Sequence, residues 1–419
     1  MKINNAYTGI RPDTRRWLII AVVFVAIVFN YMDRQLVSIL KPMLKTEFSL
    51  NDEGYAVIVN IFTICYAAMY PVTGWMVDKF GEKKVMFYGI IAWSLACLGG
   101  GLSSTVKQFG FFRGMLGMAE PTNFPAQIKV VTVWFPGKLR ATANSFCVAG
   151  SSIGAIIAPP LIAWLAITYS WKMAFVAMGI TGLFIALLWK LVYREPPAGI
   201  TGAEEGQADS TVKFRWAELW KTRSLWGVIL IRFVSDPVWY FCLFWLPGYL
   251  QEESGLTLAQ VGMFGWIPFL AADLGAIGTS AWSDRLVRKG MEPLRARKIM
   301  LTTVAVLAPL CAVTPYLSGP WVTILLFSLV AVACLSWLFS LSVVIAEAFP
   351  VANVASVLGI AGGFGAVGAV LFNYFVGQMM GTMGTEKIFL AMAVMHPLAV
   401  LLLWVMVRKE RPGITRKTE

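Results

Sequence analysis

Several charged side chains lie inside long apolar segments of the 419-residue chain. Asp33 and Arg34 are adjacent in one segment, and Arg113 and Glu120 are seven residues apart in another. An ionisable group inside a bilayer costs at least about 2.5–3.5 kcal/mol on insertion scales, so each needs a partner or a function. Two helical turns place Arg113 and Glu120 on one face, where a base and an acid can bind an anion and carry a proton. The alternative is a structural ion pair that fastens two helices.

The second half of the chain has a sparser set of such groups. Arg232 and Asp236 have i, i+4 spacing and can pair on one helix face, either as part of a site or as a self-neutralising pair. Asp273 is the single charge in its apolar run and is a possible site residue, while Glu347 lies near a helix end and suits a gate or a loop. His396 can titrate near neutral pH, although a packed core histidine explains it equally simply.

Aromatic residues near these charges suit a sugar-like ligand, because they combine an apolar face with a hydrogen-bond donor. The candidates are Trp93, Trp239, Tyr240 and Trp245. Of these, Trp239 is taken as a substrate-binding candidate. Packing or an interfacial position is the alternative role for most of the 17 tryptophans.

Twelve apolar runs of roughly twenty residues must position these side chains, and each can cross about 30 Å of hydrocarbon as a helix. They lie near 18–40, 54–77, 85–104, 108–128, 141–166, 172–192, 225–250, 258–282, 298–317, 321–346, 352–378 and 386–407. Charged residues make up only 14% of the chain, against about 25% in soluble proteins. We therefore predict an all-α membrane protein with twelve transmembrane helices in two six-helix halves, and not a soluble enzyme.

Basic residues set the predicted orientation. Of the 35 lysines and arginines, 27 fall on the side of the two termini, while Lys41, Lys45, Lys107, Lys172 and Lys387 fall on the other. The positive-inside rule then makes both termini cytoplasmic in an inner (plasma) membrane. The net charge of +12 thus reports topology and not a nucleic-acid partner.

A polar stretch divides the chain into two halves, which share a weak internal repeat at a shift of 214 residues. Secondary transporters use such repeats, with substrate bound near the midplane between them. The predicted segments are a cytoplasmic segment 1–16, a six-helix half 17–193, a cytoplasmic linker 194–223, a second six-helix half 224–407 and a cytoplasmic tail 408–419.

The segment GWMVDKFGEKK resembles the loop signature of the major facilitator superfamily. The matching positions are Gly74, Asp78, Gly81 and Lys83. The resemblance implies the major facilitator fold, with Asp78 and nearby basic residues forming a cytoplasmic gate.

Further motifs are similar to the anion:cation symporter family, namely YMDR at 31–34, RGMLGMAE at 113–120, WFP at 134–136 and GSSIGAIIAPPL at 150–161. Within it, SWKMAF, RFVSDPVW and FLAADLG resemble the bacterial hexuronate branch. The resemblance implies protonation at Asp33 and Glu120 and ligand contacts from Tyr66 and Ser151. It also implies carboxylate binding by Arg34 and Arg113. Because Arg232, Asp236 and Asp273 match the hexuronate branch, the resemblance places any selectivity in the second half.

We expect a proton-coupled symporter that imports sugar-acid anions such as galacturonate or glucuronate, with protonation of Glu120 releasing Arg113 to hold substrate. The partners expected are the anion, protons and the lipid bilayer, with a monomeric protein, no metal and no cofactor besides the proton gradient. The alternatives are a transporter of another organic anion, an exporter, a membrane receptor, or a membrane-embedded enzyme, for which the sequence has no metal-ligand or nucleophile motif.

Overall fold

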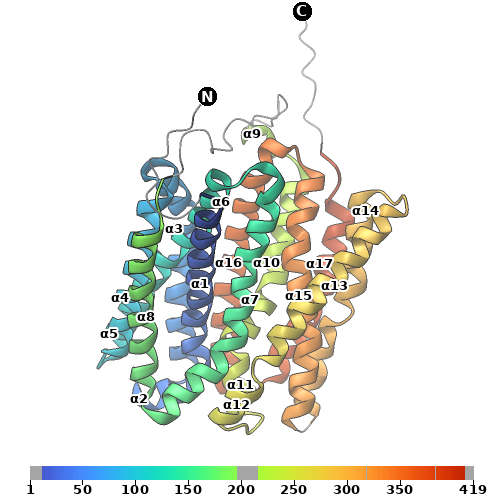
Figure 1. Cartoon of the computed structure of the whole chain (residues 1–419). Helices are drawn as coiled ribbons and strands as arrows, with labels where there is room; N and C mark the ends of the chain where they lie inside the picture. Colours follow the sequence, from blue (N-terminus) through green and yellow to red (C-terminus); the bar gives the residue numbers. More distant parts are fainter. Residues whose placement is uncertain (1–11, 196–215, 318, 383, 411–419) are drawn as a thin grey trace, which may run out of the picture.

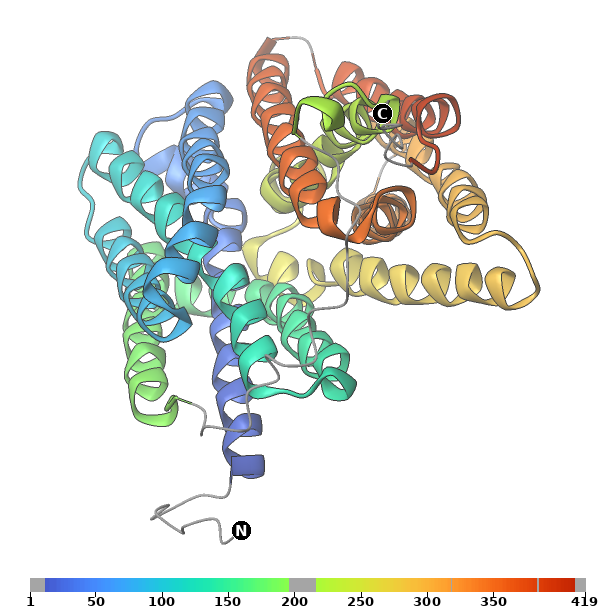
Figure 2. The ribbon, with the colours of Figure 1, turned by 90° about the horizontal axis from the view of Figure 1, so that it is seen from above.

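The computed structural model describes residues 12–195, 216–317, 319–382 and 384–410, which are all helix or connecting segment and contain no strand. Most of the predicted linker and the ends of both terminal segments lie outside these residues. The helices form two bundles, seen side by side from above in Figure 2. Within the described ranges, eleven helices are long and apolar enough to cross a membrane, which is consistent with twelve spans.

The first bundle contains the chain up to Val192 (Figure 1). Its elements are α1 (Pro12–Ile39), α2 (Lys41–Glu47), α3 (Asp52–Phe80), α4 (Glu82–Gly101), α5 (Val106–Ala119), η1 (Glu120–Thr122), α6 (Asn123–Trp134), α7 (Gly137–Thr168) and α8 (Trp171–Val192). The fourth predicted span is therefore not one helix. Pro121 lacks a backbone N–H, and α5 gives way to a 3-10 turn at Glu120.

The second bundle follows the short α9 (Trp216–Leu219). Its elements are α10 (Arg223–Phe244), α11 (Leu246–Glu252), α12 (Leu258–Phe264), α13 (Ile267–Arg288), α14 (Pro293–Ala305), η3 (Ala308–Tyr316), α15 (Pro320–Ala348), α16 (Val351–Thr382) and α17 (Glu386–Met406). The short helices α2, α11 and α12 lie at the end of the molecule opposite both termini (Figure 1). We call this end the outer end, following the predicted orientation.

The two halves repeat the same close helix contact. A Cβ on Gly154 of α7 would lie 2.4 Å from the carbonyl oxygen of Val28 in α1, and one on Gly368 of α16 would lie 2.2 Å from that of Phe233 in α10. Only glycine permits these approaches. The two glycines are 214 residues apart, so the weak sequence repeat corresponds to a repeated packing contact.

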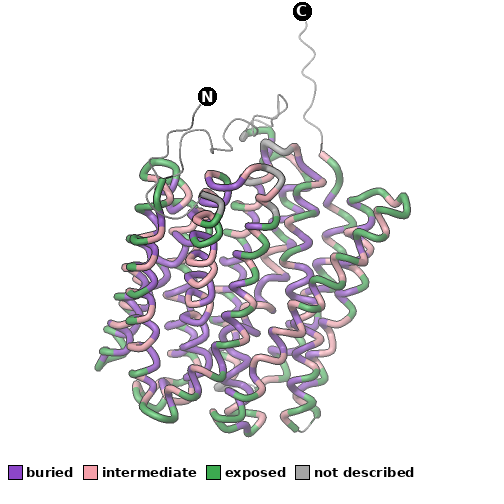
Figure 3. Tube along the Cα trace, in the orientation of Figure 1, coloured by how far each residue is buried: buried purple, intermediate pink, exposed green. Residues whose placement is uncertain are grey.

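Many exposed side chains around the sides of the bundles are large and apolar, as expected where the protein contacts lipid instead of water. On α8, Ile180, Phe184, Leu187 and Leu191 are all exposed and follow one helical stripe. Exposed and buried positions alternate in this way along the helices in Figure 3.

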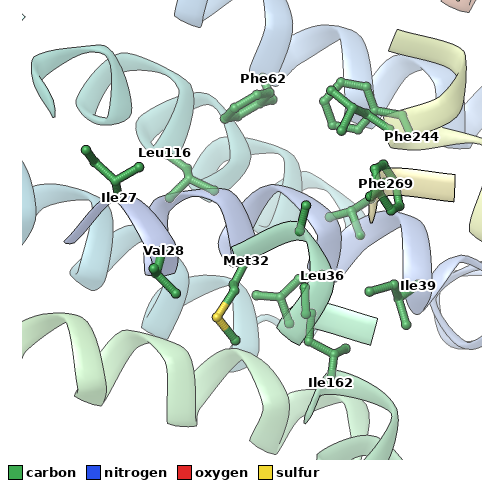
Figure 4. Close-up of a cluster of buried hydrophobic side chains, with 14 of the residues drawn as sticks. Ile27, Val28, Met32, Leu36, Ile39, Phe62, Leu116, Ile162, Phe244 and Phe269 are labelled. Carbon is green, nitrogen blue, oxygen red and sulfur yellow. The ribbon is translucent and has the colours of Figure 1, made fainter. Parts of the chain in front are cut away.

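Apolar packing joins the halves at their outer ends. Met32, Leu36 and Ile39 of α1 belong to the same buried cluster as Phe244 of α10 and Phe269 of α13 (Figure 4). The inner part of the second half has a separate core, built around Leu225, Trp337 and Leu403 among others. The halves therefore share a core toward the outside and not along their whole length.

Candidate functional site

Glu120 pairs with an arginine on another helix. Arg34 Nε of α1 lies 2.7 Å from Glu120 Oε2, and the two side chains are 16% and 0% exposed, respectively. The second oxygen, Oε1, has no hydrogen-bond partner among the described residues. The acid and the base come from positions 86 residues apart, with Glu120 lying where α5 meets η1.

Arg113 is buried, and none of its three guanidinium nitrogens has a hydrogen-bond partner among the described residues. Its guanidinium lies 4.7 Å from the centre of the Phe62 ring, a cation–π contact. Arg113 therefore forms no hydrogen bond to Glu120. The two-turn spacing itself holds, because Glu120 keeps helical dihedral angles and its N–H bonds to the carbonyl of Leu116, but its Oε2 is held by Arg34.

Asp33 and Arg34 point to different surroundings. Asp33 is buried, and Cys97 Sγ of α4 donates to its Oδ1 over 3.7 Å. Arg34 lies between two aromatic rings, 4.6 Å from the centre of Tyr66 and 5.0 Å from that of Tyr31. Tyr66, a predicted ligand contact, therefore lies next to Arg34, which is partly exposed, whereas Arg113 is buried.

Ser151 and Ser152 have different partners. Ser151, the predicted ligand contact, is buried and donates to the carbonyl of Val148 in its own helix. Ser152 donates across the bundles to Asp273 Oδ1 of α13 over 2.6 Å. The sequence analysis missed Ser152, although its place in the same small-residue run was a usable signal.

The other second-half candidates lie mainly along α10. Arg232 Nη1 is 3.1 Å from Asp236 Oδ2, so the pair predicted from the i, i+4 spacing is present. Gly365 of α16 packs on it, since a Cβ there would lie 2.2 Å from Asp236 Oδ2. Trp239 is half-buried and packs edge-on against Phe269, with ring centres 6.1 Å apart.

Two aromatic candidates and the histidine are buried in packing positions. Trp93 is buried, and Trp245 donates from its indole nitrogen to Asn373 Oδ1. His396 is buried edge-on to Trp337, and neither of its ring nitrogens has a hydrogen-bond partner among the described residues.

The predicted gate motif forms contacts within the first half. Asp78 Oδ1 is 3.4 Å from Lys129 Nζ of α6, and Gly81 ends α3 with a φ of +83°, which favours glycine. The carbonyl of Lys83 accepts from Trp189 of α8, while Gly74 borders open space.

In the second half, Arg297 forms the comparable contacts at the helix ends opposite the outer end. It bridges Asp284, at 2.6 Å, and Glu347, at 3.4 Å. Glu347 thus holds an ion pair where α15 ends, near the expected gate.

An outer cluster of four charges, Lys41, Lys45, Asp52 and Glu252, joins the halves. Lys41 Nζ has no exposed surface and lies 2.7 Å from Asp52 Oδ1 and 2.6 Å from Glu252 Oε2. Lys45 Nζ lies 3.1 Å from an oxygen of each acid. Burial lowers the pKa of Lys45, but its hydrogen bond to Glu252 and the charges of Asp52 and Glu252 outweigh burial and raise it. The sequence analysis noted both lysines only as exceptions to the positive-inside pattern.

The inner and outer parts of α16 differ. A Cβ on Gly377 would lie 2.6 Å from Ala56 Cβ of α3, whereas one on Gly359 would have nothing within 4 Å. These glycines are five full turns apart and therefore lie on one face of the helix. That face contacts the first half at the outer end and faces open space toward the opposite end.

Known proteins resemble the chain in sequence. The major facilitator superfamily profile matches residues 23–295. The hexuronate transporter of Escherichia coli K12 is 30% identical over 413 residues, which cover 95% of both chains. The galacturonate transporter of Dickeya chrysanthemi is 32% identical over 70% of this chain and 88% of its own.

Solved structures share the fold. A bacterial homologue of the lysosomal transporter Spinster superposes with a TM-score of 0.78 at 16% identity, covering 97% of this chain and 100% of that one. A D-xylose–proton symporter superposes with a TM-score of 0.72 at 14% identity, covering 94% and 98%.

Proposed function

Because the chain belongs to the major facilitator superfamily, we propose that this multi-pass membrane protein is a proton-coupled symporter that imports sugar-acid anions by alternating access. The substrates proposed are hexuronates, galacturonate and glucuronate, which the two most similar relatives described above support by their names. The proposal includes an inner-membrane position with both termini cytoplasmic, a monomeric protein and a proton gradient as the driving force.

The observation that carries the proposal is the Arg34–Glu120 pair together with the buried Arg113, whose guanidinium has no hydrogen-bond partner among the described residues. With Asp33, these residues form a set of two bases and two acids, whose charges sum to zero when both carboxyls are ionised. Protonation of one carboxyl leaves a net charge of +1 in a site of low dielectric, and one carboxylate anion neutralises it. Proton and anion then favour each other's binding, which is the coupling that symport requires.

Glu120 is the proton site that fits this scheme best, because its carboxylate forms an ion pair with Arg34. A proton on Glu120 weakens that ion pair and frees the guanidinium for a substrate carboxylate, which it can grip with two parallel hydrogen bonds. Arg113 supplies further unused donors. This differs from the expectation from sequence, in which Glu120 released Arg113.

Alternating access has a structural basis in the uneven contact between the halves. The outer charge cluster and the contact at Gly377 close the outside, while Gly359 on the same helix face borders open space. This arrangement corresponds to a cytoplasm-open state, from which an importer releases its substrate. Rocking of one half against the other would open the outside.

Uptake by the purified protein in proteoliposomes tests the proposal. Labelled galacturonate and glucuronate should accumulate against their gradients when the outside is acidified, and a protonophore should abolish accumulation. Downhill transport at a rate that does not depend on the proton gradient would show that transport is not coupled to protons. If the protein transported a different organic acid and neither hexuronate competed with it, the proposed substrates would be wrong.

A further inference from the structure

A groove on the lipid-facing side of the first bundle lies apart from the charged site. It has a volume of about 520 Å³ and is formed by α3, α4 and the region where α5 meets η1. Its walls are almost wholly apolar and include Met69, Met76, Ala92, Met115 and Met118. Methionine side chains are unbranched and adaptable, and they fit flexible apolar ligands well.

The depth of the groove in the membrane follows from the helix directions. α3 ends and α4 begins at the cytoplasmic side, so Met76 and Lys84 are near that surface. Tyr88 and Met118, at 64% and 43% exposure, show that the groove opens outward between the helices. The groove therefore opens to the inner leaflet of the bilayer.

The cytoplasmic mouth of the groove is basic. Lys84 lines the groove itself and is exposed, and Lys79 and Lys83 are exposed close by. The nearest acids in sequence already have partners, because Asp78 pairs with Lys129 and Glu82 accepts from Tyr193. Basic pockets between transmembrane helices on the cytoplasmic side attract anionic lipid headgroups.

From this placement we propose that the groove binds an anionic phospholipid of the inner leaflet, with one acyl chain between α3, α4 and α5 and the phosphate at Lys84. Ala119 and Thr122, which flank the helix break at Glu120, form part of the groove lining. A bound chain therefore lies beside the segment that carries Glu120. Because the groove exists only in the folded protein, lipid occupancy should stabilise that fold by mass action.

Native mass spectrometry of the delipidated full-length protein tests the site, with phosphatidylglycerol and phosphatidylcholine of identical chains as probes. Phosphatidylglycerol should bind more tightly. Lys84→Gln should lower its affinity about fivefold, the effect of one lysine near an anionic surface, and leave phosphatidylcholine unchanged. Ala92→Phe should fill the groove and abolish the binding of both lipids there.

Two matched controls make the test specific. Leu187→Phe adds an aromatic ring at a lipid-facing position of α8, and Lys289→Gln removes an exposed cytoplasmic lysine from the second half. Neither control should change binding. Normal lipid binding by folded Ala92→Phe would overturn the proposal, as would equal effects of Lys289→Gln and Lys84→Gln.

Discussion

Arg34 and Glu120 form an ion pair in which only the arginine has exposed surface, 16% against 0% for the acid. An anion that enters the space between the halves therefore meets the arginine before it meets the carboxylate. Because Arg34 Nε is already held at 2.7 Å by Glu120, substrate must compete with an internal anion. In the proposed scheme, a proton on Glu120 removes that competitor and so ties anion binding to proton binding.

Glu120→Gln should abolish uphill uptake driven by a pH gradient while keeping substrate counterflow. Glutamine keeps the size and a hydrogen-bond acceptor but cannot exchange a proton, so coupling is lost and exchange is not. Uptake and counterflow in the same proteoliposomes measure the two activities. Glu386→Gln, an exposed acid of α17, should change neither. Full proton-driven uptake by Glu120→Gln would show that another group carries the proton.

Arg113→Lys should raise KM about tenfold or more, because losing one hydrogen bond to a charged group costs about 1.5–3 kcal/mol. It should leave Tm nearly unchanged, since the guanidinium has no protein hydrogen bond to lose among the described residues. Arg34→Lys should raise KM and also lower Tm, because it disturbs the pair with Glu120. A lower Tm with normal KM in Arg113→Lys would indicate a structural role.

The parts of the structure that the sequence predicted correctly depend on local or repeated patterns. Apolar runs predict spans because a helix must satisfy its own backbone inside lipid. The Arg232–Asp236 pair was predictable because i, i+4 neighbours share a helix face. Both inferences use spacing along one continuous helix.

The errors and omissions concern contacts between distant segments. The Arg34–Glu120 pair joins residues 86 positions apart, so helix spacing, which relates Glu120 only to Arg113, could not find it. Lys41 and Glu252 are 211 residues apart, and Ser152 and Asp273 are 121 apart. Such pairs depend on how the two bundles dock, which no local pattern encodes.

Gly365→Ala should lower Tm, because the added Cβ would lie 2.2 Å from Asp236 Oδ2 and force the Arg232–Asp236 pair to move. Overpacking of this kind costs about 1–3 kcal/mol. Gly362→Ala is the matched control on the same helix, since nothing lies within 4 Å of its added Cβ. Thermal unfolding of both variants in one detergent measures the difference. Equal Tm values would show that the pair relaxes without cost.

Ser151→Ala and Ser152→Ala should have different effects despite their adjacency. Ser152→Ala removes a donor to Asp273 across the halves, at a cost of about 1.5–3 kcal/mol to the cytoplasm-open state. It should therefore shift the conformational balance, seen as greater accessibility from outside. Ser151→Ala should change KM alone if Ser151 contacts substrate. Identical behaviour of the two variants would contradict both assignments.

Glu252→Gln should open the outer end more often, because it leaves the fully buried Lys41 and its neighbour Lys45 with one acid instead of two. Spin labels at Thr46 of α2 and at Glu253, next to α11, report the distance between the halves at the outer end. In the variant, the population with the longer distance should increase. Glu386→Gln should leave the distribution unchanged.

The effect of Glu252→Gln on this outer distance should be the same at pH 6 and pH 8. The pKa of Lys45 is raised in the folded protein, so its stabilising charge is fully present below the ordinary lysine pKa and is lost only as pH rises through the raised value. We therefore expect the cluster to hold the outer end closed independently of pH between pH 6 and pH 8. In the proposed symporter, the response to the proton gradient then comes from groups outside this cluster, such as Glu120. An outer distance that widens in the unsubstituted protein between pH 6 and pH 8 would contradict this division of roles.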